Sequence, residues 1–120
     1  MAAEIEEMFK KMSTHEGVKG LLVINAEGIP IRSTLENALQ VQYAALIHGF
    51  FLQSKNTIRE INPQDTLDCI RLRSYKHEIM VFPSQDYLLI AIQEPGVKLW
   101  RIYRKKMKKI KWKMDRVARK

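Results

Sequence analysis

A continuous helical pattern over Asn37–Ile61 constrains the fold more than any other part of the sequence. Its apolar residues recur every three or four positions, as on the buried face of an α-helix. The pattern ends at Asn62-Pro63, because proline disfavours helical geometry in the residue before it. This apolar stripe is wider than one core face needs, so the sequence predicts a second packing partner for the helix. The stripe comprises Leu39, Tyr43, Leu46, Phe50 and Ile58, widened by Ala44, Ile47, Phe51 and Ser54.

Strand-like segments lie on both sides of this helix. Residues 20–25 and 29–34 are rich in β-forming residues around the tight turn 25–28, which predicts a hairpin. After the helix, residues 67–73, 78–82 and 87–93 predict three strands, and the last is nearly all apolar, as in a central strand covered on both faces. The spacing of apolar residues over Ala3–Ser13 predicts a first helix. We expect the order α-β-β-α-β-β-β, an α/β (α+β) fold with a helix-flanked, mainly antiparallel five-stranded sheet.

The net charge of +8 is distributed unevenly along the chain. Residues 98–120 hold twelve Lys and Arg against Asp115, which gives +11, whereas residues 1–97 carry a net charge of −3. The basic character therefore belongs to the last segment alone. We divide the chain into a domain at residues 1–96 and a basic amphipathic tail at residues 97–120.

Several kinds of site and protein are excluded or disfavoured by what the sequence lacks. Cys69 is the only cysteine, which excludes an intramolecular disulfide and a cysteine-based zinc site. The three histidines fall in different predicted elements, and no Gly-rich phosphate-binding motif occurs. We expect no catalytic, metal-binding or cofactor-binding site, and hence no enzyme. The acidic N-terminus and the absence of an apolar run of about 20 residues favour a cytoplasmic protein.

Five short motifs follow one another along residues 3–95 in a characteristic order. They are Glu27-Gly28-Ile29-Pro30-Ile31, Tyr43-Ala44, Ile70-Arg71-Leu72-Arg73-Ser74, Glu78-Ile79-Met80-Val81, and Asp86-Tyr87 with Leu89-Ile90 and Ile92-Gln93. Each motif alone is weak, but the ordered set resembles the roadblock-type (roadblock/light-chain-7) light chains of cytoplasmic and axonemal dynein.

The resemblance implies a noncatalytic light chain of the dynein motor complex, on the microtubule cytoskeleton of the cytoplasm. Such an adaptor binds the dynein intermediate chain and helps link the motor to cargo in microtubule-based transport. The resemblance also implies a dimer, of two identical copies or with a paralogous light chain, in which long helices pack together and sheets join edge to edge. The broader superfamily supplies an alternative function, a scaffold or regulator of a small GTPase that also lacks a catalytic site.

The implied dimer and the wide helical stripe together select candidate interface residues. We expect the segment 67–73 to be the sheet edge that pairs across the dimer, with Arg71 guarding that edge or contacting an acidic partner. At a two-fold interface a substitution such as Ile47→Asp acts twice. The alternative is that the extra apolar residues meet the first helix or the tail of the same protomer. The candidates are Tyr43, Ile47, Phe50, Phe51, Ser54, Leu67, Cys69 and Arg71.

The basic tail lies outside the resemblance and is interpreted from its own residues. Like charges four residues apart oppose a helix there by about 1–2.5 kcal/mol in total, so we expect the tail to fray unless something covers its apolar side. That side is predicted from residues spaced alternately three and four apart. They are Trp100, Tyr103, Met107, Ile110, Met114 and Val117.

Four partners for the tail stay open. They are the domain itself, an acidic protein surface, calmodulin or an anionic membrane, and nucleic acid. We regard nucleic acid and a membrane as the less favoured of these. The residues assigned to partner binding are Trp100, Arg101, Tyr103, Arg104, Lys105, Met107, Lys108, Ile110 and Met114.

Overall fold

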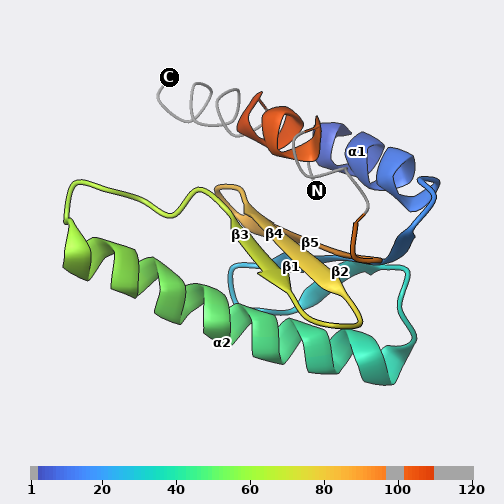
Figure 1. Ribbon diagram of the computed structural model, residues 1–120, viewed down its shortest axis with the longest axis horizontal. Helices are drawn as coiled ribbons and strands as arrows, with labels where there is room; N and C mark the ends of the chain where they lie inside the picture. Colours follow the sequence, from blue (N-terminus) through green and yellow to red (C-terminus); the bar gives the residue numbers. More distant parts are fainter. Residues whose placement is uncertain (1–2, 97–101, 110–120) are drawn as a thin grey trace.

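The computed structural model describes residues 3–96 and 102–109, and Figure 1 shows a sheet with helices on both of its faces. The elements are α1 (Ala3–Ser13), β1 (Val18–Asn25), β2 (Pro30–Ser33), α2 (Asn37–Ile61), β3 (Ile70–Arg73), β4 (Glu78–Pro83) and β5 (Tyr87–Gln93). Residues 102–109 form one more helical segment, which we call the C-terminal helix. The predicted fold class and element order are confirmed.

The sheet has the strand order β2-β1-β5-β4-β3, and every neighbouring pair is antiparallel. β5 therefore lies in the middle, with Leu89 opposite Val23 of β1 and Ile90 opposite Val81 of β4. Its residues from Leu88 to Gln93 are buried, which confirms the expectation of a central strand covered on both faces. β2 and β3 form the two edges of the sheet.

Two hydrophobic cores lie on opposite faces of this sheet, and Figure 1 shows the helices that cover them. α2 covers one face, and we call the apolar cluster beneath it the α2-side core. α1 and the C-terminal helix cover the other face, over the α1-side core. The α2-side core contains Leu22, Ile24, Ala44, Ile47, Ile70, Val81, Leu88 and Ile90. The α1-side core contains Ile5, Met8, Phe9, Met12, Leu21, Val23, Met80, Phe82, Leu89, Ala91, Tyr103 and Met107.

The predicted hairpin between β1 and β2 closes through Asn25 and Gly28. The Asn25 Oδ1 atom accepts hydrogen bonds from the backbone N–H groups of Glu27 and Ile29, at 3.0 and 2.9 Å. Gly28 has a φ of +84°, the left-handed conformation that favours glycine. A Cβ atom at Gly28 would lie 2.9 Å from the His48 ring, so this turn packs directly against α2.

β3 is shorter than the predicted strand 67–73. The ladder begins at Ile70, which faces Val81 of β4. In the same register residue 68 would face Pro83, and a proline has no N–H to donate to a ladder. Residues 67–69 consequently lead into the strand as irregular backbone.

Candidate interaction surfaces

The first surface is an exposed apolar face on α2. The side chains of Leu39, Leu46 and Phe50 lie along one side of the helix, and Leu46 is 65% and Phe50 40% exposed. The other side of α2 packs on the sheet through Ala44 and Ile47. The wide apolar stripe of the sequence thus consists of two faces, one turned to the core and one turned to solvent. Exposed apolar patches of this kind mark interaction sites.

The predicted interface residues of α2 are divided between these two faces. Ile47 is only 6% exposed and belongs to the α2-side core, and Tyr43 and Phe51 are half-buried against that core. Ser54 is also half-buried, whereas Phe50 is exposed. Leu46, which the predicted set omitted, is more exposed than any of the five. The sequence signal that could have found it is its position in the stripe, four residues before Phe50.

The second surface is the edge of the sheet at β3. Arg71 and Arg73 are exposed on this strand, while Ile70 and Leu72 turn toward the α2-side core. The guanidinium of Arg71 forms an ion pair with Glu78 of the neighbouring strand. Glu78 is completely buried, so this pair fixes Arg71 along the strand edge. Glu78 is not among the predicted site residues, because a single acid at the start of a strand carries no local sign of burial.

Leu67 and Cys69, the remaining predicted interface residues, lie in the segment that leads into β3. Both are half-buried. Leu67 packs against the α2-side core and Cys69 against the α1-side core, so the two side chains turn toward opposite faces of the sheet. A strand over the whole of residues 67–73 would put both side chains on one face, so the predicted strand is wrong at its first three residues, which are irregular.

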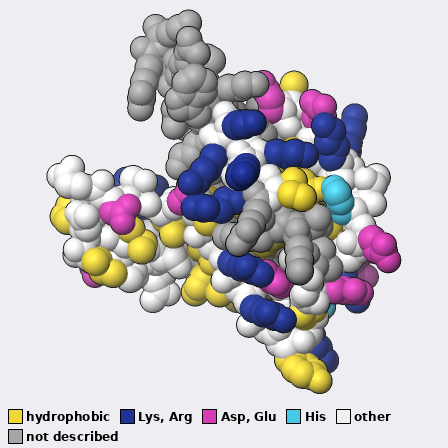
Figure 2. Space-filling view, turned by 45° about the horizontal axis from the view of Figure 1, so that its top comes forward, with side chains coloured by type: hydrophobic (Ala, Val, Ile, Leu, Met, Phe, Trp, Pro, Cys, Tyr) yellow, Lys and Arg dark blue, Asp and Glu magenta, His cyan; other side chains and the backbone are white. Residues whose placement is uncertain are grey.

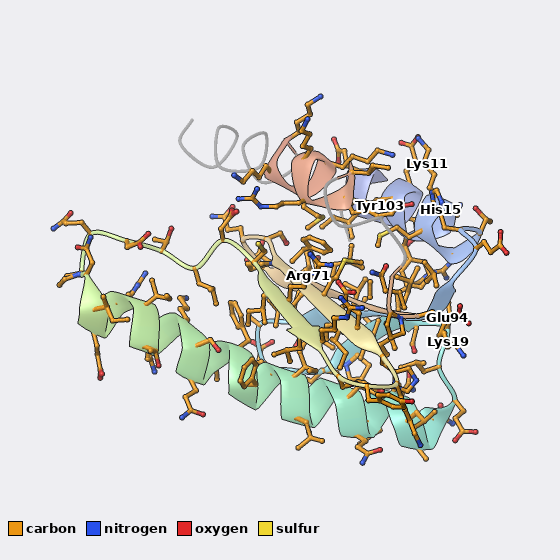
Figure 3. The ribbon with its side chains drawn as sticks, viewed as in Figure 1. Lys11, His15, Lys19, Arg71, Glu94 and Tyr103 are labelled. Carbon is orange, nitrogen blue, oxygen red and sulfur yellow. The ribbon has the colours of Figure 1, made fainter. Side chains whose placement is uncertain are left out.

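The C-terminal helix is part of the folded core. Tyr103 and Met107 are buried in the α1-side core, so the domain itself covers this part of the apolar side of the tail. The domain was the first of the four partners left open by the sequence. The Tyr103 ring stands edge-on to His15, at 5.4 Å between ring centroids, and Figure 3 shows the two side chains together. Burial raises the pKa of the Tyr103 hydroxyl above its ordinary value. No described residue forms a hydrogen bond to that hydroxyl.

The predicted tail cations Arg104, Lys105 and Lys108 are exposed on the outside of this helix. Arg104 Nη2 lies 3.4 Å and Lys108 Nζ 3.6 Å from the same atom, Asp68 Oδ2. Asp68 is absent from the predicted site residues, because no local pattern connects it to a segment 36 residues away in the chain. The other predicted tail residues lie outside the described residues: they are Trp100, Arg101, Ile110 and Met114.

Among residues 3–96 and 102–109, no three His, Cys, Asp or Glu side chains come together as a metal site would require. In the same part of the chain, no helix is long and apolar enough to cross a lipid bilayer. A small hollow of about 140 Å³ lies between the β1–β2 turn, the β4–β5 turn and α2, beside His48, Lys55 and Tyr87. The described residues offer two surfaces for protein contact, the exposed face of α2 and the edge of the sheet at β3.

Comparison with known proteins agrees with this fold. Residues 4–94 match the Roadblock/LC7 domain family. The structure is similar to a Roadblock/LC7 domain from Streptomyces avermitilis, with a TM-score of 0.75 and 8% identity over 93% of this chain and 94% of that one. It is similar to MglB from Myxococcus xanthus, with a TM-score of 0.67 and 13% identity over 91% and 89% of the two chains.

A third similar structure is an MglB with a tetrameric arrangement. Its TM-score is 0.69 and its identity 12%, over 89% of this chain and 87% of that one. At such identities the likeness concerns the fold, whereas the family match covers most of the sequence itself. The chain therefore belongs to the Roadblock/LC7 domain family.

Proposed function

We propose that this protein is a noncatalytic roadblock-type scaffold that forms a dimer and presents a joint surface to a protein partner. The observation that carries the proposal is the exposed apolar face of α2, with Leu46 65% exposed, on an element that shares one core with the edge strand β3. An exposed apolar face and an edge strand are both liabilities for a monomer in water. A second copy covers both at once when the helices pair and the sheets join.

The geometry of α2 supports a two-fold contact. Leu39, Leu46 and Phe50 follow one another along the same side of the helix, so two such helices can pack by interdigitating these side chains. In a two-fold dimer each side chain meets the same patch on the second copy, which makes the interface self-complementary. The tetrameric arrangement described for one MglB supports self-association of this fold.

We propose a small GTPase as the partner, with this chain as its scaffold or regulator. The family match alone does not distinguish a GTPase partner from a dynein partner. The similar structures reported above are a Roadblock/LC7 domain from Streptomyces avermitilis and MglB proteins rather than dynein light chains, and this favours the GTPase candidate. The second candidate is the dynein intermediate chain, which would place the protein on microtubules in the cytoplasm. It is favoured by the ordered set of sequence motifs from Glu27 to Gln93, which resembles the dynein light chains.

The two candidates separate in one binding experiment. The immobilised full chain is offered a panel of purified small GTPases, each loaded with GDP or a GTP analogue, and fragments of dynein intermediate chains. Retention of one GTPase, with preference for one nucleotide state, supports the first candidate. Retention of an intermediate-chain fragment alone replaces it with the second, and a chain that retains neither class contradicts both.

A further inference from the structure

The outward side of the C-terminal helix is a strip of cations. Its apolar residues Tyr103 and Met107 turn inward to the α1-side core. The three residues between them and the two after Met107 are exposed and basic, whereas Ile102, before Tyr103, is exposed and apolar. Figure 2 shows Lys and Arg side chains gathered over the layer that α1 and this helix form. We call these five residues the basic strip: Arg104, Lys105, Lys106, Lys108 and Lys109.

The described residues neutralise the strip only in part. Arg104 and Lys108 share the single carboxylate of Asp68. Lys106 lies over the Tyr103 ring, with its Nζ atom 5.5 Å from the ring centroid. Lys105 and Lys109 form no ion pair with any described residue. One helical turn apart, these two lysines repel each other and point away from the core.

Carboxylates border the strip on both sides. Asp68 lies along one side, at the contact with the segment that leads into β3. On the other side, Glu4 and Glu7 of α1 line a shallow hollow of about 190 Å³ together with Lys106 and Lys109. Within the described residues of this helix, the positive charge thus forms a strip about one helix wide, with Asp68 beyond one border and Glu4 and the Glu7–Lys11 ion pair beyond the other.

This shape favours a narrow acidic ligand over a broad anionic surface. A bilayer requires a free apolar face for an amphipathic helix to insert, and within residues 102–109 the apolar side formed by Tyr103 and Met107 is already buried in the protein. A nucleic-acid duplex carries phosphates across a wide surface, which would bring them against Glu4, Glu7 and Asp68. An extended polypeptide places alternate side chains on one side at about 7 Å intervals, and so aligns carboxylates along a single strip.

We infer that the basic strip is a docking site for an acidic polypeptide segment of a partner protein. The ligand's carboxylates pair with Lys105 and Lys109 at the centre of the strip and compete with Asp68 for Arg104 and Lys108. The site lies on the opposite face of the sheet from α2, so it is separate from the exposed apolar face of α2, while its Asp68 border adjoins the start of the β3 edge. The inference does not depend on the identity of the partner in the proposed function.

The test uses the full chain and a fluorescent oligo-glutamate peptide, with an oligo-glutamine peptide as the uncharged probe. Binding is measured for the natural sequence, for Lys105→Glu/Lys109→Glu, and for the control Lys55→Glu/Lys76→Glu, which changes the net charge equally at sites away from the strip. We expect the strip variant to bind the acidic peptide at least about tenfold more weakly and the control to stay within about twofold.

Zero-length carboxyl-to-amine crosslinking, mapped by mass spectrometry, adds a readout of position. We expect the peptide's glutamates to couple to Lys105 and Lys109 in preference to Lys10 and Lys76. The inference would be overturned if both variants bound the peptide equally weakly, or if crosslinks were scattered over all exposed lysines. Either result would mean that binding depends on the net charge of the protein and not on the basic strip. The inference would also be overturned if phosphatidylserine-containing vesicles or a short DNA duplex bound as tightly as the peptide or more tightly, and if this binding disappeared in the strip variant.

Discussion

Asp68 and Arg104, 36 residues apart in the sequence, are joined by an ion pair of 3.4 Å between Asp68 Oδ2 and Arg104 Nη2. Lys108 approaches the same oxygen to 3.6 Å. Asp68 lies two residues before β3, so this contact connects the C-terminal helix to the start of an edge strand. The C-terminal helix is therefore attached to the domain in two ways, by these ion pairs and by the packing of Tyr103 and Met107 in the α1-side core.

We predict that Asp68→Asn loosens the C-terminal helix without unfolding the protein. Both ion pairs are partly exposed, so their loss lowers the free energy of unfolding by no more than about 1 kcal/mol each, and less at high salt. Amide hydrogen exchange within residues 103–109 should become faster. Asp65→Asn is the matched control, because Asp65 lies in the same loop and forms no ion pair with a described residue. Equal exchange rates in the two variants would show that the pairs do not hold the helix.

Tyr103 should contribute to stability through its ring and not through its hydroxyl. Tyr103→Ala leaves a cavity in the α1-side core, and we expect a loss of about 3–5 kcal/mol in the free energy of unfolding. Tyr103→Phe keeps the ring and removes a buried hydroxyl that no described residue bonds. The second change should therefore shift the free energy by less than about 1 kcal/mol, in either direction. Urea unfolding of the three proteins measures both values.

The same hydroxyl predicts a loss of stability at alkaline pH. Burial raises the pKa of Tyr103 in the folded protein above the ordinary value of 10.0. Above that pH the unfolded chain releases the Tyr103 proton while the folded protein still holds it, so ionisation favours unfolding. The contribution is complete below about pH 10 and is lost as the pH rises through the folded pKa.

Tyr103→Phe is the control for this effect, because other groups also titrate at high pH. The difference in unfolding free energy between the natural sequence and Tyr103→Phe should be constant at neutral pH and change in favour of the variant above about pH 10. A difference that stays constant across this range would mean that the hydroxyl is solvated in the folded state.

The sequence predicted the two long helices with their observed ends, Ala3–Ser13 and Asn37–Ile61. Their apolar periodicity is local, and Pro63 stops the second helix within a residue or two. The start of β3 was predicted three residues too early. It depends on Pro83 of β4, which would face residue 68 in the same register but lies 15 residues further along the chain. Local sequence patterns indicate where a helix or strand forms, whereas the length of a β-ladder also depends on the residues of the neighbouring strand.

For the candidate surfaces, too, local patterns predicted the apolar residues but not the surroundings into which each side chain packs. The spacing of Tyr103 and Met107 predicted an apolar side, but nothing in that spacing says that the α1-side core covers it. The width of the α2 stripe predicted two packing surfaces, but not that Ile47 faces the core while Leu46 faces solvent. Such assignments depend on how far the helix is rotated on the sheet, and this rotation is fixed by tertiary packing.

The β1–β2 turn should tolerate little change at Gly28. An alanine there adopts a strained positive φ, and its methyl carbon lies 2.9 Å from the His48 ring. We expect Gly28→Ala to lower the free energy of unfolding by more than about 1 kcal/mol. Gly49→Ala on α2 is the control, because its methyl group has open space and should stabilise the helix by about 1 kcal/mol.

The steric part of this cost can be separated from the backbone part. His48→Ala removes the ring, together with its 3.0 Å contact to the Ala26 carbonyl oxygen. In that background Gly28→Ala should cost less than in the natural sequence, since only the strain at φ remains. An unchanged cost would show that the ring moves aside freely.

The exposed face of α2 gives the most direct prediction about assembly. Leu46→Asp puts a charge on a side chain that is 65% exposed, so the protomer should stay folded while a dimer that uses this face dissociates. Ile47→Asp, the variant suggested by the sequence, would instead bury a carboxylate in the α2-side core and unfold the chain. Val41→Asp is the control, because Val41 is 61% exposed on a different side of α2.

Sedimentation velocity at micromolar concentration measures the outcome, and circular dichroism checks that each variant is folded. We expect the natural sequence and Val41→Asp to sediment as dimers and Leu46→Asp as a folded monomer. Because each substitution occurs twice in a two-fold interface, the two new carboxylates repel across it, and one change per chain is enough. A natural sequence that sediments as a monomer, or a Leu46→Asp variant that remains dimeric, contradicts the assignment of this face to the dimer.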